Sequence, residues 1–264
     1  FVAGKIRGLL DDGLAPEEIA VLFRATHHSQ ALEFALMRQG MEYDYRGGLR
    51  FFDRAHVKDA LAFLRVCANP ADEAAWLRIL RLQPGIGEIG AAKAAGILRR
   101  SESIGRAAKA TVGAALGPKA GKGWDELRTI IEALVTAGDA PMAQIRAVLD
   151  SSYSVYIENE YPDSRERFED LEQLAGFAGG YAKAAEMLAD VALDVTSAGG
   201  ARGRASTMPR IVLSTVHQAK GLEWDTVFVI HLAGSAFPNR RAALEEGGLE
   251  EERRLFYVAI TRAK

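Results

Sequence analysis

Five chemically different groups occur together in one short segment of this 264-residue sequence. Residues 213–224 read LSTVHQAKGLEW and contain a hydroxyl, an imidazole, an amine, a glycine and a carboxylate. The segment begins inside a β-rich run at 210–216 and precedes a second such run at 226–232. In open α/β sheets, ligands bind in the crevice at the carboxyl ends of the strands. The spacing therefore predicts a ligand-binding loop at such an edge.

Other patterns that could do chemistry do not complete a known arrangement. A P-loop needs G-x-x-x-x-G-K-[ST], but residues 116–123 lack both the first glycine and the final hydroxyl, so we interpret them as a basic loop. The five histidines are too scattered for a Ser/His/Asp arrangement, and we interpret His27 and His28 as exposed loop residues. The acidic run 245–252 is interpreted as the start of a helix, where carboxylates favour the helix dipole. No metal site is predicted.

Composition restricts the class of protein. Hydrophobic residues make up 48% and charged residues 26%, which excludes collagen-like and disordered chains. No apolar run approaches the length of a membrane span. The single cysteine, Cys67, excludes a disulfide framework and a Cys-rich zinc module, and it fits a reducing cytosol. We therefore expect a soluble, cytoplasmic protein without a membrane partner.

The net charge of −2 conceals a strong asymmetry along the chain. Residues 76–123 contain nine basic and only two acidic side chains, a balance of +7. Residues 124–194 contain five basic and fifteen acidic side chains, a balance of −10. Such a division is expected when one face meets a polyanion and another stays in water. Solvated helix faces that neutralise each other are the alternative.

Hydrophobic periodicity predicts α/β structure at both ends of the chain and helices in the middle. Before Asn69-Pro70 and after residue 205 we expect, in order, a strand at 19–23, a helix at 29–39, a strand at 42–46, a helix at 54–66, strands at 210–216 and 226–232 and a helix at 250–263. Both late strands have few polar interruptions, which is typical of parallel strands buried on both faces. The middle is Ala-rich, and residues 197–207 resemble a flexible linker. The pattern predicts a discontinuous domain of residues 1–70 and 205–264, with a helical subdomain at 71–204.

Four segments resemble motifs of the UvrD/Rep-like superfamily 1 DNA helicases. Residues 213–224 resemble motif V, 251–263 resemble motif VI, and 19–23 with Arg24 resemble motif IV. Residues 45–54 are similar to the element that follows motif IV. The four occur in the family's order, with a helical insertion between the second and the third. The resemblance implies an α/β fold: a discontinuous RecA-like parallel-sheet domain with an inserted all-helical subdomain.

The resemblance also implies a function, that of the C-terminal part of an ATP-dependent helicase moving 3′ to 5′ on DNA. Its implied partners are single-stranded DNA, a duplex junction and the first RecA-like domain of the same parent chain. That first domain carries the family's Walker A and B residues and holds most of the ligands of the Mg²⁺ that accompanies ATP. None of these residues is present here, so this chain alone should not hydrolyse ATP. Both ends, Phe1 and the stop directly after motif VI, are expected to be cut.

The resemblance assigns nucleotide-binding roles to particular residues. Arg24 and Arg262 match the two arginines that reach the γ-phosphate. An arginine supplied there by a second domain or protein raises the rate of phosphoryl transfer about 10³–10⁵-fold. Phe23 matches an aromatic residue that stacks on adenine, although a core phenylalanine remains the alternative. Glu223 matches the acidic residue at the ribose, and Gly221 is expected beside it in the nucleotide site. Lys220, next to Gly221, is not assigned to a ligand.

DNA contacts are implied at two places. In motif V, Thr215 and His217 match residues that contact the single strand through phosphate and sugar, without reading sequence. Residues 83–90, QPGIGEIG, resemble the family's duplex-contacting GIG motif. A Gly-x-Gly hairpin at a helix N-terminus offers backbone N–H groups to phosphate, which makes Gly85, Ile86, Gly87 and the nearby Lys93 candidates for duplex binding. An ordinary helix–helix turn is the alternative.

Three other functions stay open at this point. The parent could be a helicase–nuclease, which a nuclease domain elsewhere would reveal. The chain could be a non-catalytic DNA-binding or regulatory module that has lost its motor half, but such a module has no use for Arg24, Glu223 and Arg262. A small-molecule α/β enzyme would need a nucleophile or base constellation that the sequence does not contain.

Overall fold

A computed structural model describes residues 1–113, 115–199, 209–233 and 236–264. It divides into two compact units, which we call the sheet unit (Phe1–Phe51 with Leu193–Lys264) and the helical unit (Phe52–Ala192). The sequence placed these divisions near residues 70 and 205. In the structure the first division comes earlier because helix α3 (Ala55–Ala68) contacts α4, α8 and α10 of the helical unit. Residue 205 lies outside the described residues.

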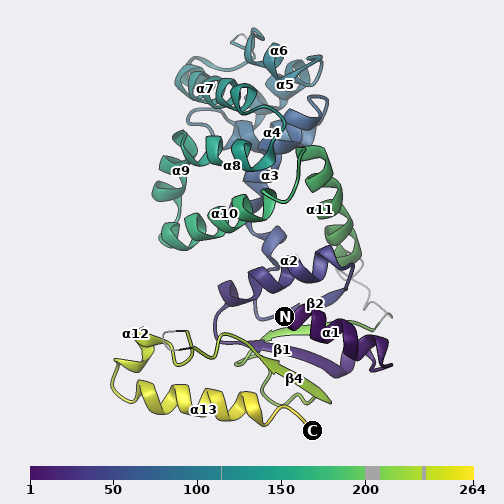
Figure 1. The fold of residues 1–264 in the computed structure, drawn as a ribbon. Coiled ribbons are helices and arrows are strands. Elements are labelled where there is room, and N and C mark those ends of the chain that lie inside the picture. The colour runs from purple at the N-terminus through teal and green to yellow at the C-terminus, as the bar shows by residue number, and fades with distance from the viewer. Residues whose placement is uncertain (114, 200–208, 234–235) are drawn as a thin grey trace. The chain divides into compact units, whose positions relative to one another are not determined.

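The sheet unit contains a four-stranded parallel sheet in the order β2-β3-β1-β4 (Figure 1). Strand β3 pairs with β2 and β1, and β1 also pairs with β4. Its strands and helices are α1 Val2–Asp11, β1 Ile19–Phe23, α2 Gln30–Arg38, β2 Tyr43–Arg46, β3 Ile211–Thr215, β4 Thr226–Val229, α12 Arg240–Ala243 and α13 Gly248–Ile260. The predicted α/β fold with a parallel sheet is confirmed.

Strand β1 is buried on both faces, which explains its unbroken apolar sequence. Ile19, Val21 and Phe23 point into a cluster that includes residues of α1 and α2. Ala20 and Leu22 point to the opposite face, where a second cluster includes Leu255 and Ala259 of α13. Alternate residues of one strand therefore join two separate cores, as the two-residue period of a strand requires.

Strand β4 departs from the prediction. The run 226–232 was expected to be buried on both faces, but the strand ends at Val229 and all four of its residues are half-exposed. Its place in the strand order supplies the reason, since β4 has β1 on one side and is the last strand of the described sheet on the other. An edge strand cannot bury its side chains as a central strand does. The expectation of full burial was wrong for this strand.

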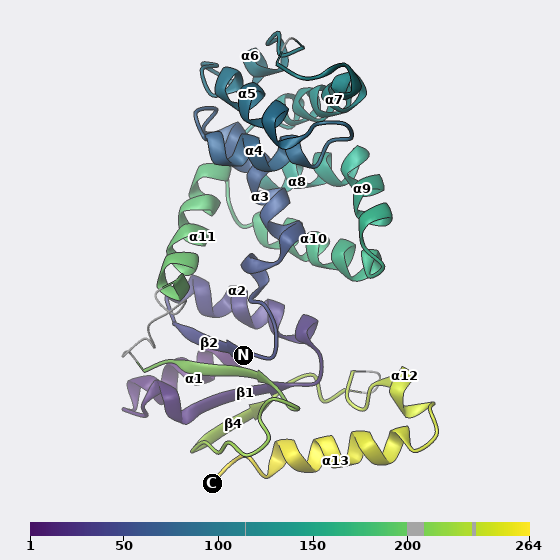
Figure 2. The ribbon, with the colours of Figure 1, turned by 180° about the vertical axis from the view of Figure 1, so that it is seen from behind.

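The helical unit consists of short helices joined by tight turns (Figure 2). Capping residues mark several starts: the Asp72 carboxylate accepts a hydrogen bond from the Ala75 N–H at 3.0 Å, and Pro141 occupies a first turn. Trp76, Phe63 and Leu98 are fully buried in its core. Its helices are α3 Ala55–Ala68, α4 Glu73–Arg81, α5 Glu88–Leu98, α6 Ile104–Ala108, α7 Gly121–Ala137, α8 Pro141–Leu149, α9 Ser152–Glu160, α10 Ser164–Ala178 and the first part of α11 Ala184–Gly199.

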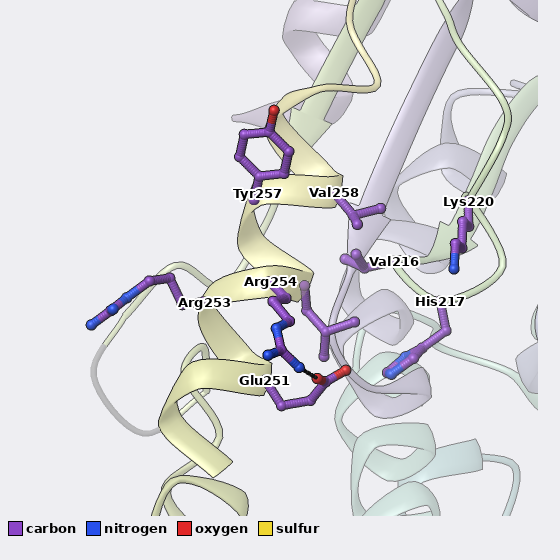
Figure 3. Close-up of a pocket in the computed structure, with 9 residues that line it drawn as sticks. Val216, His217, Lys220, Glu251, Arg253, Arg254, Tyr257 and Val258 are labelled. Atoms are coloured by element: carbon purple, nitrogen blue, oxygen red, sulfur yellow. Dashed lines mark hydrogen bonds and ion pairs between the residues drawn. The ribbon is translucent and has the colours of Figure 1, made fainter. Parts of the chain in front are cut away.

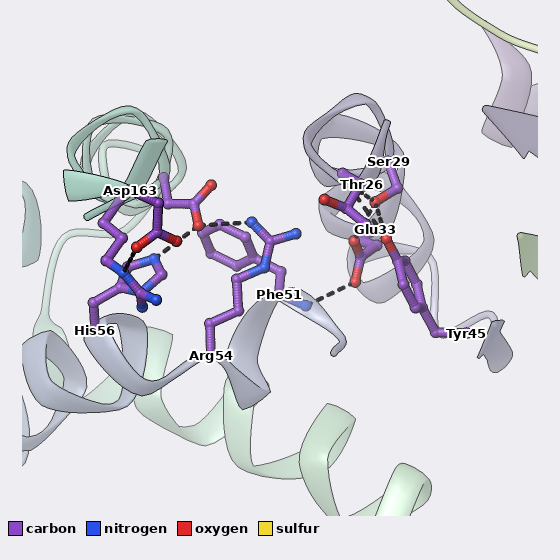
Figure 4. A network of polar contacts seen from close by, with 10 residues as sticks. Thr26, Ser29, Glu33, Tyr45, Phe51, Arg54, His56 and Asp163 are labelled. Atoms are coloured by element: carbon purple, nitrogen blue, oxygen red, sulfur yellow. Dashed lines mark hydrogen bonds and ion pairs between the residues drawn. The ribbon is translucent and has the colours of Figure 1, made fainter. Parts of the chain in front are cut away.

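A buried polar network orients α3 against α10 in the helical unit (Figure 4). The His56 Nδ1 atom lies 2.9 Å from the Arg167 guanidinium, which can only donate, so Nδ1 accepts. The His56 Nε2–H then donates to the Asp170 carboxylate at 2.7 Å, and Arg54 donates to the same oxygen at 2.6 Å. Burial raises the pKa of Asp170, but the hydrogen bond from His56 and the charge of Arg54 outweigh it, and the net pKa is lowered.

A second network lies within the sheet unit and centres on Glu33, which is fully buried (Figure 4). Its carboxylate accepts hydrogen bonds from the Ser29 hydroxyl at 2.7 Å, the Tyr43 hydroxyl at 3.0 Å and the Phe51 N–H at 3.0 Å. The Ser29 bond stays at the start of α2, whereas the Tyr43 and Phe51 bonds tie α2 to the start of β2 and to the segment that follows it. The network therefore holds α2 against β2 and against Phe51, which lies in the segment 45–54 singled out in the sequence.

Helix α11 continues to Gly199, so the first residues of the expected linker 197–207 are helical, and residues 200–207 lie outside the described residues. Across the described ranges, no helix is both long enough and apolar enough for a membrane span.

Candidate functional site

The loop between β3 and β4 is held against the end of α13. The Trp224 N–H donates to the Arg262 carbonyl at 2.9 Å, and the Lys264 N–H donates back to the Trp224 carbonyl at 3.0 Å. Trp224 itself is buried in the core on that face of the sheet. Gly221 has a φ of +83°, a conformation that side-chain-bearing residues rarely adopt. The glycine turn and the buried tryptophan together bring exposed Glu223 to the end of α13.

The Arg262 guanidinium is held in place by backbone carbonyl groups. It donates to the Val258 carbonyl at 3.0 Å and to the Leu222 carbonyl, 40 residues away in sequence, at 3.0 Å. In the described parts of the chain, no carboxylate contacts this guanidinium, and Glu223 has no ion-pair partner. The arrangement therefore keeps a full positive charge, oriented by neutral acceptors, next to an exposed carboxylate. Such a pair of groups can bind a ligand that presents both anionic oxygens and hydroxyl donors.

Arg24 follows β1 directly and is held by a carboxylate. Its Nε and Nη2 atoms both donate to one oxygen of Glu252 at 2.7 Å. The other Glu252 oxygen accepts from the Asn239 N–H at 2.8 Å. The Glu252 side chain is 2% exposed and that of Arg24 is 22% exposed. One edge of the Arg24 guanidinium is thus fixed, while part of the group stays accessible to solvent.

The two arginines lie toward opposite ends of α13. Arg24 contacts Glu252 in the first half of the helix, whereas Arg262 follows its last turn. Arg24 is thus fixed by a carboxylate, whereas the Arg262 side chain turns back toward the Val258 and Leu222 carbonyls.

Phe23 is placed in the core. Its side chain is fully buried, and its ring centroid lies 5.7 Å from that of Tyr45. No face of the ring is free for an adenine base in this arrangement, which agrees with the alternative of a core phenylalanine. Of the side chains predicted to bind nucleotide, those of Arg24, Glu223 and Arg262 are at least partly exposed.

The motif V residues lie at the carboxyl end of β3. Thr215 ends the strand and is 8% exposed, partly because Gly47 packs against it. A Cβ atom added at Gly47 would lie 2.7 Å from the Thr215 hydroxyl oxygen, and the φ of Gly47 is +102°. His217, two residues further on, is exposed. The structure thus brings Thr215 and His217 to the same strand end but gives only His217 an open side chain.

His217 borders a pocket of about 620 Å³ between the β3–β4 loop and α13 (Figure 3). Lys220 lies on the same wall, and Glu251, Arg254 and Tyr257 lie on the facing wall. Arg254 donates to Glu251 at 3.2 Å, which neutralises part of the charge on that wall. His217 and Lys220 have no ion-pair partner in the described ranges. The pocket is therefore open to an anionic ligand from the loop side.

The predicted hairpin in the helical unit is present. Gly85 has a φ of +75°, and Gly87 is the N-cap of α5, where no side chain caps the helix. Ile86 is 7% exposed and anchors the turn, while Lys93 is exposed on α5. The backbone N–H groups of the first turn of α5 are consequently not covered by a capping side chain. The stretch 116–123, which was interpreted as a basic loop, contains a 3₁₀ turn at 118–120 and enters helix α7 at Gly121.

Two buried polar residues were not foreseen. His27 is exposed as expected, but His28 is 8% exposed and stacks on His231 with 4.6 Å between ring centroids, so the expectation of an exposed loop was wrong for His28. Burial, followed by the neighbouring His27, His231 and Arg24, lowers the pKa of His28 to about 4. Glu252 was read only as part of an acidic helix start. Glu250 and Glu251 do lie in the first turn of α13, whereas Glu252 turns inward.

Among the described residues, no group of three or more histidine, cysteine, aspartate or glutamate side chains is arranged to hold a metal ion.

The parallel sheet with its helical insertion, and the charged loop at the end of α13, together define the class of protein. The UvrD-like helicase C-terminal domain family matches residues 1–107 and 135–264, and this chain belongs to that family. The match leaves out residues 108–134.

Curated relatives are similar over the whole chain. The ATP-dependent DNA helicase PcrA of Bacillus subtilis is 32% identical over 279 residues, and the DNA helicase II proteins of Haemophilus influenzae and Escherichia coli are 34% and 33% identical. Each alignment covers 100% of this chain and 38% of the relative. The chain thus spans less than half the length of these helicases.

Proposed function

We propose that the parent protein is an ATP-dependent DNA helicase that moves 3′ to 5′, and that this chain supplies its second RecA-like domain. In this proposal the sheet unit is that domain, and the helical unit is an inserted, DNA-contacting subdomain. The observation that carries the proposal is the placement of Arg262 beside Glu223, 39 residues earlier in sequence. The bonds from Arg262 to Leu222 and from Trp224 to Arg262 support it.

On the nucleotide face, Arg262 acts on the transferring phosphoryl group. Charge spreads over the γ-phosphoryl oxygens in the transition state, and a guanidinium brought in by a second domain stabilises that charge. Glu223 accepts a hydrogen bond from the ribose, and Gly221 gives the loop the turn that places Glu223 there. Arg24 approaches the phosphates from the other end of α13. ATP is bound in the cleft with the first RecA-like domain, whose residues hold the Mg²⁺.

On the DNA face, Thr215 and His217 contact the single strand, and Gly85, Ile86, Gly87 and Lys93 contact the duplex. Both contacts are directed at phosphate and sugar and so are independent of sequence. Closure of the two RecA-like domains on ATP and their opening after hydrolysis would move the strand across the motif V residues. The chain alone, which contains no P-loop sequence, is expected to be inactive as an ATPase, and the parent is expected to act in the cytoplasm.

The test compares the full-length parent with its Arg262→Ala variant in ATP hydrolysis stimulated by single-stranded DNA. We expect a wild-type rate that depends on DNA and a loss of about 10³-fold or more in the variant. Binding of a fluorescent ATP analogue should be largely kept, because Arg262 acts mainly in the transition state.

Arg7→Ala is the matched control, since Arg7 lies on α1 and packs near Gln39 instead of at the β3–β4 loop. This control should hydrolyse ATP like the wild type. A parent without DNA-stimulated hydrolysis would contradict the helicase proposal. A fully active Arg262→Ala variant would contradict only the role assigned to Arg262 and would leave the helicase proposal standing.

A further inference from the structure

A backbone-lined pocket of about 340 Å³ lies in the helical unit, beside the hairpin. One wall is formed by Gly85, Ile86, Gly87 and Gly90 at the start of α5. The other wall is formed by Leu116, Gly117, Lys119 and Ala120, just before α7. We call the second wall and the first turn of α7, residues 116–123, the glycine–lysine segment. With four glycines around it, the pocket admits a ligand close to the main chain.

The glycine–lysine segment is locked to the hairpin by two reciprocal contacts. A Cβ atom added at Gly85 would lie 2.3 Å from the carbonyl oxygen of Lys119. A Cβ atom added at Gly123 would lie 2.3 Å from the carbonyl oxygen of Pro84. Both distances are far below van der Waals contact, so only glycine permits the two main chains to approach in this way. The hairpin and the segment therefore form one rigid surface.

Exposed lysines lie on the glycine–lysine segment and on α5. Lys119 and Lys93 are exposed and have no ion-pair partner in the described ranges. The Lys122 side chain is 82% exposed and meets only Glu126, at 3.7 Å, one turn along the same helix. Glu88, the acidic residue closest to the hairpin in sequence, is paired with Arg81 at 2.6 Å. Lys119 lines the pocket and Lys122 lies three residues further along the same segment, so this segment can attract an anion.

We propose that the glycine–lysine segment is a second phosphate-contacting element for duplex DNA, in which Lys119 and Lys122 bind the backbone next to the hairpin. The inference rests on the proposed function and adds to it a named surface. The segment lies inside residues 108–134, which the family match leaves out, so the assignment comes from this chain's own residues. A wall of main chain and lysines, without side chains that read bases, fits phosphate contacts that do not depend on sequence.

The test measures binding of the full-length parent, without nucleotide, to a fluorescent blunt duplex and to a single strand of the same sequence. We expect the Lys119→Ala/Lys122→Ala variant to bind the duplex about tenfold or more weakly, and to lower the slope of log K against log salt by about 2. Single-strand binding and single-strand-stimulated ATP hydrolysis should stay within about twofold of the wild type, since these steps belong to the sheet unit.

The control variant Arg165→Ala/Lys183→Ala removes the same charge from exposed positions on α10 and at the start of α11. It should bind the duplex like the wild type. Duplex binding that is unchanged in the Lys119/Lys122 variant, or reduced equally in both variants, would overturn the inference. Because binding is measured without ATP, a parent that fails to hydrolyse ATP would contradict the proposed function without deciding this result.

Discussion

Glu252 joins segments that are 228 residues apart and shows how a single buried carboxylate organises the sheet unit. One oxygen accepts two bonds from Arg24 and the other accepts the Asn239 N–H. Removing one partner of a buried ion pair costs more than the pair contributes, because the remaining charge loses its compensation. The neighbouring Glu251, whose side chain is 58% exposed, pairs with an Arg254 side chain that is 78% exposed, and exposed pairs contribute little.

We therefore expect Glu252→Ala to lower the free energy of unfolding of this chain by about 3 kcal/mol, and Glu251→Ala by less than about 0.5 kcal/mol. Urea denaturation followed by circular dichroism measures both. Glu252→Gln should fall between them: its amide oxygen can accept from Arg24, but its NH₂ group would then face the Asn239 N–H, donor against donor. Equal losses of unfolding free energy in the two alanine variants would show that burial does not increase the contribution of the Arg24–Glu252 pair.

At the scale of elements, the two glycines at the start of α7 differ in how well they would tolerate a side chain, because only one of them packs against the hairpin. Gly121 and Gly123 both lie in its first turn. A Cβ atom added at Gly121 meets nothing within 4 Å, whereas one at Gly123 would collide with the Pro84 carbonyl at 2.3 Å. The same chemical change should thus have opposite consequences two residues apart.

Gly121→Ala should leave the stability of the chain unchanged or raise it by up to about 1 kcal/mol, since alanine restricts the unfolded chain more than glycine does. Gly123→Ala should lower it by about 2 kcal/mol, because the two main chains must separate. Thermal unfolding of the two variants and the wild type measures the difference. If Gly123→Ala proves as stable as Gly121→Ala, the hairpin and the glycine–lysine segment do not form the close contact described above.

At the scale of the whole molecule, one unit is formed by a single continuous segment of the chain and the other by two separate segments. The helical unit is continuous, and its core residues, among them Phe63, Trp76 and Leu98, all come from residues 52–192. The sheet unit is discontinuous, since β2 pairs only with β3 and β1 pairs only with β3 and β4 in the described sheet. Strands β1 and β2 thus have no strand neighbour until residues after 208 are added.

The fragment 52–192 is consequently expected to fold alone, with helical circular dichroism and one cooperative unfolding transition in urea. The fragment 1–51 is its control and should remain largely unfolded, because its two strands do not pair with each other. A fragment 52–192 that unfolds gradually, without a cooperative transition, would show that the helical unit depends on the sheet unit for its stability.

Local pattern was enough to predict several elements and most of the candidate site. The strand Ile19–Phe23 was predicted at its observed bounds because a central parallel strand must be apolar on both faces. The loop containing Gly221 and Glu223 was singled out by its mixture of chemical groups, whereas Arg262 at the end of α13 and the hairpin at Gly85 were singled out mainly by their resemblance to motifs of a helicase family. These features depend on residues that are close together in sequence.

Contacts between distant residues could not be predicted in this way. The sequence shows Arg24 and Glu252 as two unrelated charged residues, and only folding makes one the partner of the other. His28 looks like a polar loop residue until His231 stacks on it, and the apolar run of β4 does not reveal that it lies at an edge. The close approach of Gly85 to the Lys119 carbonyl joins residues that are separated in sequence by the two helices α5 and α6.

The sequence alone determined the α/β class and the parallel strands, because periodicity expresses local requirements, and its resemblance to a helicase family singled out the residues predicted to bind nucleotide and DNA. The tertiary structure decided which of those residues remain available: it buried Phe23, paired Arg24 with Glu252, oriented Arg262 by carbonyl oxygens and joined the glycine–lysine segment to the hairpin. Burial and charge pairing depend on what the rest of the chain brings to each position, and that information is not contained in any single segment.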